Sequence, residues 1–131
     1  MREGWLGDDY IILFSEEEAT AASRRYGIGE ALPGCTIIGL WGWDDFLVRD
    51  PAGRTFTVPT VPMSAGYQRE IALPPAAPLL ADDRFTGRIK WYVTPIIFGG
   101  DPEPGENLIW VSHDDHAALV TWWNARYHEL Q

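Results

Sequence analysis

The chain of 131 residues is 46% hydrophobic and 13% aromatic, and 19 acidic against 10 basic residues give it a formal net charge of −9. This length predicts a single domain, residues 1–131, built around one hydrophobic core. The charge and the lack of any Lys/Arg cluster argue against nucleic-acid binding, and leave two interpretations open: an acidic surface that keeps the protein soluble, or one that attracts a basic partner protein.

The sequence also indicates a reducing compartment. Cys35 is the one cysteine, so no internal disulfide can form, and beside the apolar run TIIGL it is typical of a small buried hydrophobe. The first residues, MREGWLGDDY, lack the basic start and apolar core of a signal peptide, and no apolar run approaches the roughly 20 residues that cross a bilayer. We therefore expect a cytoplasmic protein that does not associate with membranes.

The first predicted element is a helix in FSEEEATAASRRYG. Ser15 can cap its N-terminus, Glu18 stands three residues later in the capping-box position, and Gly27 suits a left-handed stop. After a turn in EALPG, the apolar and β-branched run CTIIGLW predicts a strand.

A hairpin is predicted next, in DDFLVRDPAGRTFTVP. The order of Asp, Pro and Gly in DPAG is typical of a type I turn, and Gly53 in the left-handed position would pair Asp50 with Arg54. Two apolar pairs then share one face of the hairpin and two threonines point outward: Phe46 with Val58, Val48 with Phe56, and Thr55 and Thr57.

The middle of the chain is rich in proline, which predicts an irregular connection with short strand or helical pieces. Four of its residues are expected in the core: Leu73, Leu79, Leu80 and Phe85. The run IKWYVTPIIFG is interrupted by Pro95, so it predicts an edge strand or two short strands, and NLIWV predicts a last strand.

The last predicted element is a helix from His113 to about Glu129. Apolar residues recur at three- and four-residue spacing and should face the core: Ala117, Val120, Trp123 and Tyr127, broadened by Leu119 and Trp122. Asn124 lies among these residues and, if buried, must hydrogen-bond to nearby backbone.

The stretch SHDDH at the start of this helix has two interpretations. Ser112 is a good N-cap, and Asp114 and Asp115 would stabilise the first turn through the helix dipole. Alternatively, His113 and His116 could bind a metal, although they are three residues apart and not four as in the zincin motif. Helix initiation is the interpretation we favour, because no third ligand at a recognised spacing completes a metal site.

No catalytic motif was found, because the chain has no nucleophile elbow, phosphate-binding loop or dinucleotide fingerprint. Two acidic stretches remain as candidate partner-binding sites. WGWDD places aromatic anchors beside charge, as in interface hot spots, although a tryptophan there could equally be a core residue. GDPEPGEN is either a solvated acidic turn or a site for a hard cation such as Ca²⁺. The candidate partner-binding residues are Trp41, Trp43, Asp44, Asp45, Asp101, Glu103 and Glu106.

The segment YGIGEALPGCTIIGLWGWDDFLVRDPAGRTFTVPTVPM resembles the central part of the SUKH superfamily, many of whose members are bacterial immunity proteins. The resemblance lies in a helix followed by a Leu-Pro-Gly turn, a strand ending in Gly, a hairpin with an Asp-x-x-Gly turn, and a strand that runs into Pro. It covers residues 26–63 and, through the C-terminal part, residues 95–130. It implies an α+β domain with a curved antiparallel sheet of five or six strands, on which an N-terminal and a C-terminal helix pack.

The same resemblance implies a function without catalysis or cofactors: binding a cognate toxin, often a nuclease or deaminase, and blocking its active site. An acidic surface would suit such a basic toxin. Two alternatives stay open. One is a small metal-dependent hydrolase built on His113, His116 and Asp114, and the other is a regulatory protein-binding module.

Overall fold

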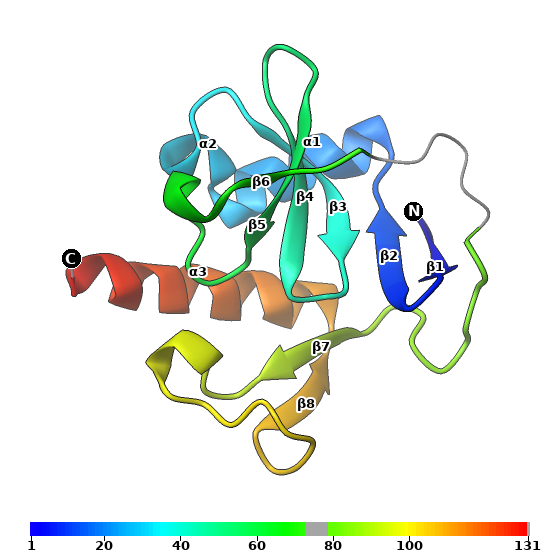
Figure 1. The fold of residues 1–131 in the computed structure, drawn as a ribbon, viewed down its shortest axis with the longest axis vertical. Coiled ribbons are helices and arrows are strands. Elements are labelled where there is room, and N and C mark those ends of the chain that lie inside the picture. Colours follow the sequence, from blue (N-terminus) through cyan, green and yellow to red (C-terminus); the bar gives the residue numbers. More distant parts are fainter. Residues whose placement is uncertain (73–78, 131) are drawn as a thin grey trace.

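The computed structural model describes residues 1–72 and 79–130, which form an α+β fold (Figure 1). Its main sheet is antiparallel, with its six strands in sequence order: β1 (Arg2–Leu6), β2 (Asp9–Leu13), β3 (Thr36–Trp41), β4 (Asp45–Arg49), β5 (Thr55–Pro59) and β6 (Arg69–Glu70). A second, two-stranded sheet pairs β7 (Ile89–Tyr92) with β8 (Leu108–Val111). The helices are α1 (Glu16–Tyr26), α2 (Ile28–Ala31) and α3 (His113–Glu129), with 3₁₀ turns η1 (Ala65–Tyr67) and η2 (Ile96–Phe98). The expected α+β fold is therefore confirmed.

The N-terminal hairpin of β1 and β2 was not predicted from the sequence. Its strands pair over their whole length, from Arg2 opposite Leu13 to Leu6 opposite Asp9. Leu80 then joins the outer side of β1, where its backbone N–H and C=O both bond to Trp5, at 3.0 and 2.8 Å. The returning chain therefore covers the outer edge of β1 at this point.

The hairpin of β4 and β5 has the predicted register, with Phe46 opposite Val58 and Val48 opposite Phe56. The turn also forms as expected, because the backbone N–H of Asp50 bonds to the carbonyl of Arg54 at 2.9 Å. Thr55 and Thr57 lie on the opposite face from the two apolar pairs, as predicted, but both are half-buried.

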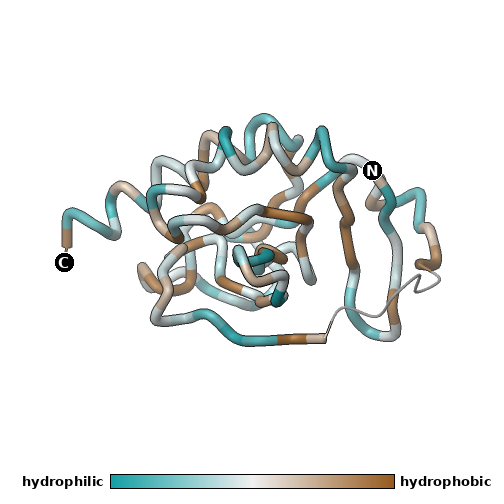
Figure 2. The backbone as a smooth tube through the Cα atoms, turned by 90° about the horizontal axis from the view of Figure 1, so that it is seen from above, coloured by the Kyte–Doolittle hydropathy of each residue, from teal (hydrophilic) through white to brown (hydrophobic). Residues whose placement is uncertain are grey.

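The threonines are covered because both faces of the main sheet carry apolar residues. On one face α1 and α3 enclose the larger core, which includes Tyr26, Phe46 and Val120. Figure 2 shows the helical coils along one side of the molecule, with the C-terminal turns of α3 extending beyond the sheet. On the other face Ile71 and Leu79 pack against a smaller cluster of buried residues that consists of Ile11, Ile38 and Leu47. The middle segment therefore forms a partial third layer.

The helix boundaries match the sequence predictions closely. Ser15 and Glu18 form a complete capping box on α1, and Gly27 ends that helix in a left-handed conformation with φ of 69°. Ser112 caps α3 by accepting a hydrogen bond from the N–H of Asp115. An ion pair between Arg25 of α1 and Asp114 of α3 joins the two helices.

The predicted core-facing stripe of α3 is only partly correct. Trp122 is 52% exposed, and Trp123 and Tyr127 are half-buried. The buried positions are His116, Ala117, Val120 and Asn124, so the buried face is rotated toward His116. Asn124 makes the expected backbone contacts: it accepts from the N–H of Met63 at 2.8 Å and donates to the carbonyl of Thr60 at 2.7 Å.

The irregular middle segment has mixed outcomes. Phe85 and Leu79 are half-buried against the two apolar clusters, but the prediction for Leu80 is wrong, because its side chain is 69% exposed. Leu73 lies outside the described residues. The run around Pro95 forms one strand, β7, which ends at Tyr92 three residues before Pro95, and then the turn η2.

Candidate partner-binding surface

Trp43 belongs to an aromatic cluster that joins the two sheets. It follows β3 with a φ of 63°, stacks on Tyr10 at 4.8 Å between ring centroids, and meets the edge of Trp110 at 5.1 Å. Trp5 and Phe85 complete the cluster. Because Trp43 is only 8% exposed, the core interpretation of the two that the sequence left open applies to it. Trp41 is half-buried and packs against the smaller cluster on the other face of the sheet.

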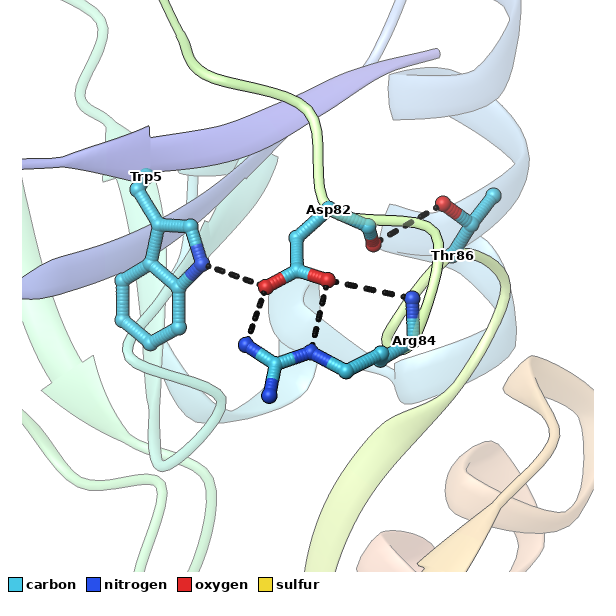
Figure 3. Close-up of polar contacts among 4 residues, drawn as sticks. All are labelled: Trp5, Asp82, Arg84 and Thr86. Atoms are coloured by element: carbon cyan, nitrogen blue, oxygen red, sulfur yellow. Dashed lines mark hydrogen bonds and ion pairs between the residues drawn. The ribbon is translucent and has the colours of Figure 1, made fainter.

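Asp82 fixes the segment that carries Phe85 (Figure 3). Its carboxylate accepts a hydrogen bond from the indole Nε1 of Trp5 at 3.0 Å and two from the guanidinium of Arg84, at 3.0 and 2.7 Å. These donors hold the pKa of Asp82 well below its usual range. Phe85 in turn stacks on Trp110 with ring centroids 5.0 Å apart. We call the contacts of Asp82 with Trp5 and Arg84 the clasp at Asp82. Through Phe85 and Trp110, this clasp helps to position the second sheet.

A pocket with a volume of about 170 Å³ opens beside this cluster. One wall comes from the turn between β3 and β4 and from the end of β5, and the other wall comes from β7 and η2. Its lining combines aromatic rings, aliphatic side chains and two carboxylates: Trp43, Asp44, Asp45, Pro59, Thr60, Val61, Trp91, Tyr92, Pro95, Ile96 and Ile97.

Lys90 lies at the edge of the pocket and pairs with one of its two carboxylates. Its ammonium is 3.3 Å from Oδ2 of Asp44, and lies 5.8 Å from the ring centroid of Trp43 and 5.3 Å from that of Tyr92. Burial raises the pKa of Asp44, and the charge of Lys90 opposes that shift. Burial and the neighbouring charge of Asp44 both raise the pKa of Asp45. Negative charge is therefore held in a partly apolar site.

Exposed apolar side chains are frequent in and next to η2 and β8, close to the pocket in the chain. Five of them are between 39% and 50% exposed: Val93, Ile96, Ile97, Ile109 and Trp110. We call these five residues the apolar patch. Two of them, Ile96 and Ile97, also line the pocket. The apolar run around Pro95 predicts strands for Ile96 and Ile97, and the proline inside it is the signal that this segment leaves the regular sheet.

The acidic loop between η2 and β8 carries Asp101, Glu103 and Glu106, and all three side chains are exposed. Asn107 anchors this loop, because its side chain accepts from the N–H of Thr94 at 2.8 Å and donates to the carbonyl of Thr94 at 3.0 Å. The loop therefore borders the apolar patch in the chain and is tied to it at Thr94.

The predicted site residues thus fall into three groups. Trp43, Asp44 and Asp45 line the pocket together with η2, whereas Trp41 packs on the other face of the sheet. The three residues of the acidic loop do not line the pocket. The two predicted stretches, WGWDD and GDPEPGEN, are therefore connected only through the turn η2, which lines the pocket and precedes the acidic loop.

The two histidines of SHDDH do not form a metal site with other residues. His116 is fully buried, and its Nδ1 lies 2.6 Å from the hydroxyl oxygen of Tyr26. Burial lowers the pKa of His116 to about 3, and the neighbouring His113 adds to this shift. Across residues 1–72 and 79–130, no group of three or more His, Cys, Asp or Glu side chains is arranged to hold a metal ion.

No protein-family model, curated protein or solved structure matches this chain. Among the described residues, no helix combines the length and apolar character that a membrane span requires. The candidate surface therefore has to be interpreted from its own geometry and charge.

Proposed function

We propose that this protein is a non-enzymatic immunity protein that binds and neutralises a cognate bacterial toxin. The observation that carries the proposal is the apolar patch beside the acidic loop. Large apolar side chains left exposed next to charged ones are typical of protein-binding surfaces on soluble domains. The resemblance to the SUKH superfamily supplies the kind of partner, a toxin in the cytoplasm of the producing cell.

The charge of the protein supports a basic partner. A net charge of −9 would attract a nuclease or deaminase whose own surface is positive because it binds nucleic acid. Charge of opposite sign on two partners raises the association rate and disfavours wrong partners. The acidic loop would contribute directly to this attraction, since its three carboxylates are exposed.

The surface is also well ordered for binding. Asn107 fixes the acidic loop to Thr94, and the clasp at Asp82 fixes Phe85 against Trp110. A surface that is ordered before binding loses less conformational entropy in the complex. These contacts therefore favour a binding role for the patch over a role as a loose solvent-exposed loop.

Co-expression with the product of a neighbouring toxin-like gene tests the proposal. We expect the two proteins to co-purify at a 1:1 ratio and the cells to survive expression of the toxin. The variant Ile97→Asp should weaken the complex by more than about 1 kcal/mol if Ile97 is an interface anchor. Leu80→Asp is the matched control, because Leu80 is exposed but lies outside the apolar patch.

Loss of both binding and growth rescue would rule out an immunity role. Binding without rescue would instead favour a regulatory protein-binding module that uses the same surface. A metal-dependent hydrolase is not supported by any arrangement of the described residues.

A further inference from the structure

The pocket between Trp43 and η2 has the size of a site for one side chain. Its volume of about 170 Å³ falls below the roughly 300–1,000 Å³ of pockets that hold drug-sized ligands. Ile96 and Ile97 of the apolar patch also line the pocket. A partner that covers the patch would therefore also cover the opening of the pocket. The occupant we consider is therefore a single side chain of the bound protein.

Of the two carboxylates that line the pocket, one has no cation close to it. Asp44 and Asp45 both line it, and Lys90 pairs with Asp44. Within the described part of the chain, the Asp45 carboxylate makes no hydrogen bond or ion pair, and the cation that lowers its pKa is Arg69 on β6. Arg69 is exposed and does not line the pocket, so solvent screens its charge. One carboxylate thus remains without a close counterion.

The aromatic walls suit a cation of a particular shape. Lys90 already lies over the rings of Trp43 and Tyr92, which shows that these rings accommodate positive charge. Arginine suits the remaining space better than lysine, because its planar guanidinium stacks on aromatic rings and can donate two parallel hydrogen bonds to a carboxylate. Arginine is also enriched among interface hot spots.

We propose that this pocket receives one arginine side chain of the partner protein, with Asp45 as its counterion and Trp43 and Tyr92 as its aromatic walls. This inference rests on the proposed protein-binding function. It gives that function a specific anchor and explains why Asp45 is half-buried in a pocket with aromatic and aliphatic walls. It also assigns Lys90 a role: neutralising Asp44 so that the pocket accepts one cation and not two.

Titration of the full chain with N-acetyl-arginine amide tests the proposal without the partner. The indole N–H signals of Trp43 and Trp91 report on the pocket in ¹H–¹⁵N spectra, because both rings line it. We expect saturable shifts of these signals with the arginine amide and none with N-acetyl-citrulline amide, which has a similar shape but no charge. Equal shifts with both compounds, or no shift with either, would overturn the proposal.

Two variants change the affinity in opposite directions. Asp45→Asn should weaken binding of the arginine amide at least about tenfold, because a charge-assisted hydrogen bond is lost. Asp101→Asn removes the same charge from the acidic loop and should leave the affinity unchanged. Lys90→Met should tighten binding, a change that a folding defect cannot produce. Weaker binding in Lys90→Met, or equal effects of the two Asp→Asn variants, would contradict the assignment.

Co-purification with the partner separates this inference from the proposed function. If Asp45→Asn binds the partner as tightly as the wild type, the arginine site is wrong and the immunity role stands. If the titration succeeds but no toxin binds, the pocket recognises guanidinium and the immunity role is wrong.

Discussion

His116 is the residue with the most unusual environment in the described structure. The rings of Tyr26, Phe46 and Trp91 surround it, and its Nδ1 is bonded to the Tyr26 hydroxyl. A charge here would lose its hydration without gaining a counterion, which is why burial lowers the pKa of His116 to about 3. The imidazole is therefore neutral at physiological pH and acts as part of the core.

This environment makes the stability depend on pH. The unfolded chain binds a proton at His116 near pH 6.5, whereas the folded protein does so only near pH 3. The free energy of unfolding should therefore fall as the pH drops from about 6.5 toward 3, by at most about 1.4 kcal/mol per pH unit for one proton. The raised pKa values of Asp44 and Asp45 act in the opposite direction, because the folded protein then binds protons more tightly than the unfolded chain.

The variant His116→Gln isolates the contribution of His116 to the pH dependence of stability. Glutamine can still accept a hydrogen bond from Tyr26 but does not titrate, so its unfolding free energy should fall less steeply than that of the wild type between pH 6.5 and 4. Urea unfolding at several pH values measures the difference in slope. The exposed His128 provides the control, since His128→Gln changes a histidine that lies outside the core. Identical slopes in the wild type and His116→Gln would show that His116 titrates normally in the folded protein.

Sequence periodicity located α3 but not the orientation of its buried face. The apolar residues alone favour a stripe through Trp123 and Tyr127, because polar residues at 116 and 124 count against burial. In the structure those two positions are buried, since Tyr26 satisfies His116 and the backbone around Met63 satisfies Asn124. Both partners are distant in sequence, so no local pattern could reveal them.

At the scale of elements, the N-terminal hairpin depends on a close approach between β1 and the segment at Leu80. A Cβ atom on Gly4 would lie 2.6 Å from the carbonyl of Leu80, so only glycine fits there without a shift of backbone. The hydrogen bonds between Trp5 and Leu80 and the clasp at Asp82 all lie next to this contact. Gly4 therefore permits the middle segment to cover the outer edge of β1.

The variant Gly4→Ala tests this arrangement. The added methyl group should push Leu80 away from β1 and lower the free energy of unfolding by more than about 1 kcal/mol. Faster hydrogen exchange at the amides of Trp5 and Leu80 would locate the effect. Gly29→Ala is the control, because a Cβ at Gly29 has no heavy atom within 4 Å and should leave the stability unchanged or raise it. Wild-type stability in Gly4→Ala would show that the two segments can separate at no cost.

The elements that sequence analysis predicted well have their determinants close together in the chain. The hairpin of β4 and β5 is set by its turn and by alternation, and α1 is set by its capping box and Gly27. The covering of β1 by Leu80 depends on a distant segment, and so does the pocket, which Trp43 and η2 line together. The pocket itself could not be predicted, because its two walls are 30 to 54 residues apart in the chain.

At the scale of the whole molecule, the net charge of −9 acts on a partner before contact. Exposed charges are screened beyond about 8 Å at physiological ionic strength, so the carboxylates nearest the interface should dominate the attraction. If the apolar patch is the binding surface, the carboxylates of the acidic loop are among those nearest the interface. Its effect should appear in the association rate and not in the dissociation rate.

Reversing the loop charges in Asp101→Lys/Glu103→Lys/Glu106→Lys tests this directly. Three reversals add six units of charge and change the net charge from −9 to −3. With the co-purifying toxin, stopped-flow mixing should show association on the order of tenfold slower and less dependent on salt, with little change in dissociation. The control is Asp8→Lys/Glu30→Lys/Glu70→Lys, which reaches the same net charge through exposed residues on other elements. Salt screens each charge beyond about 8 Å, so charges far from the interface contribute little to the association rate. The control should therefore slow association much less than the loop variant. Equal slowing in both variants would show that the net charge, not the acidic loop, attracts the partner.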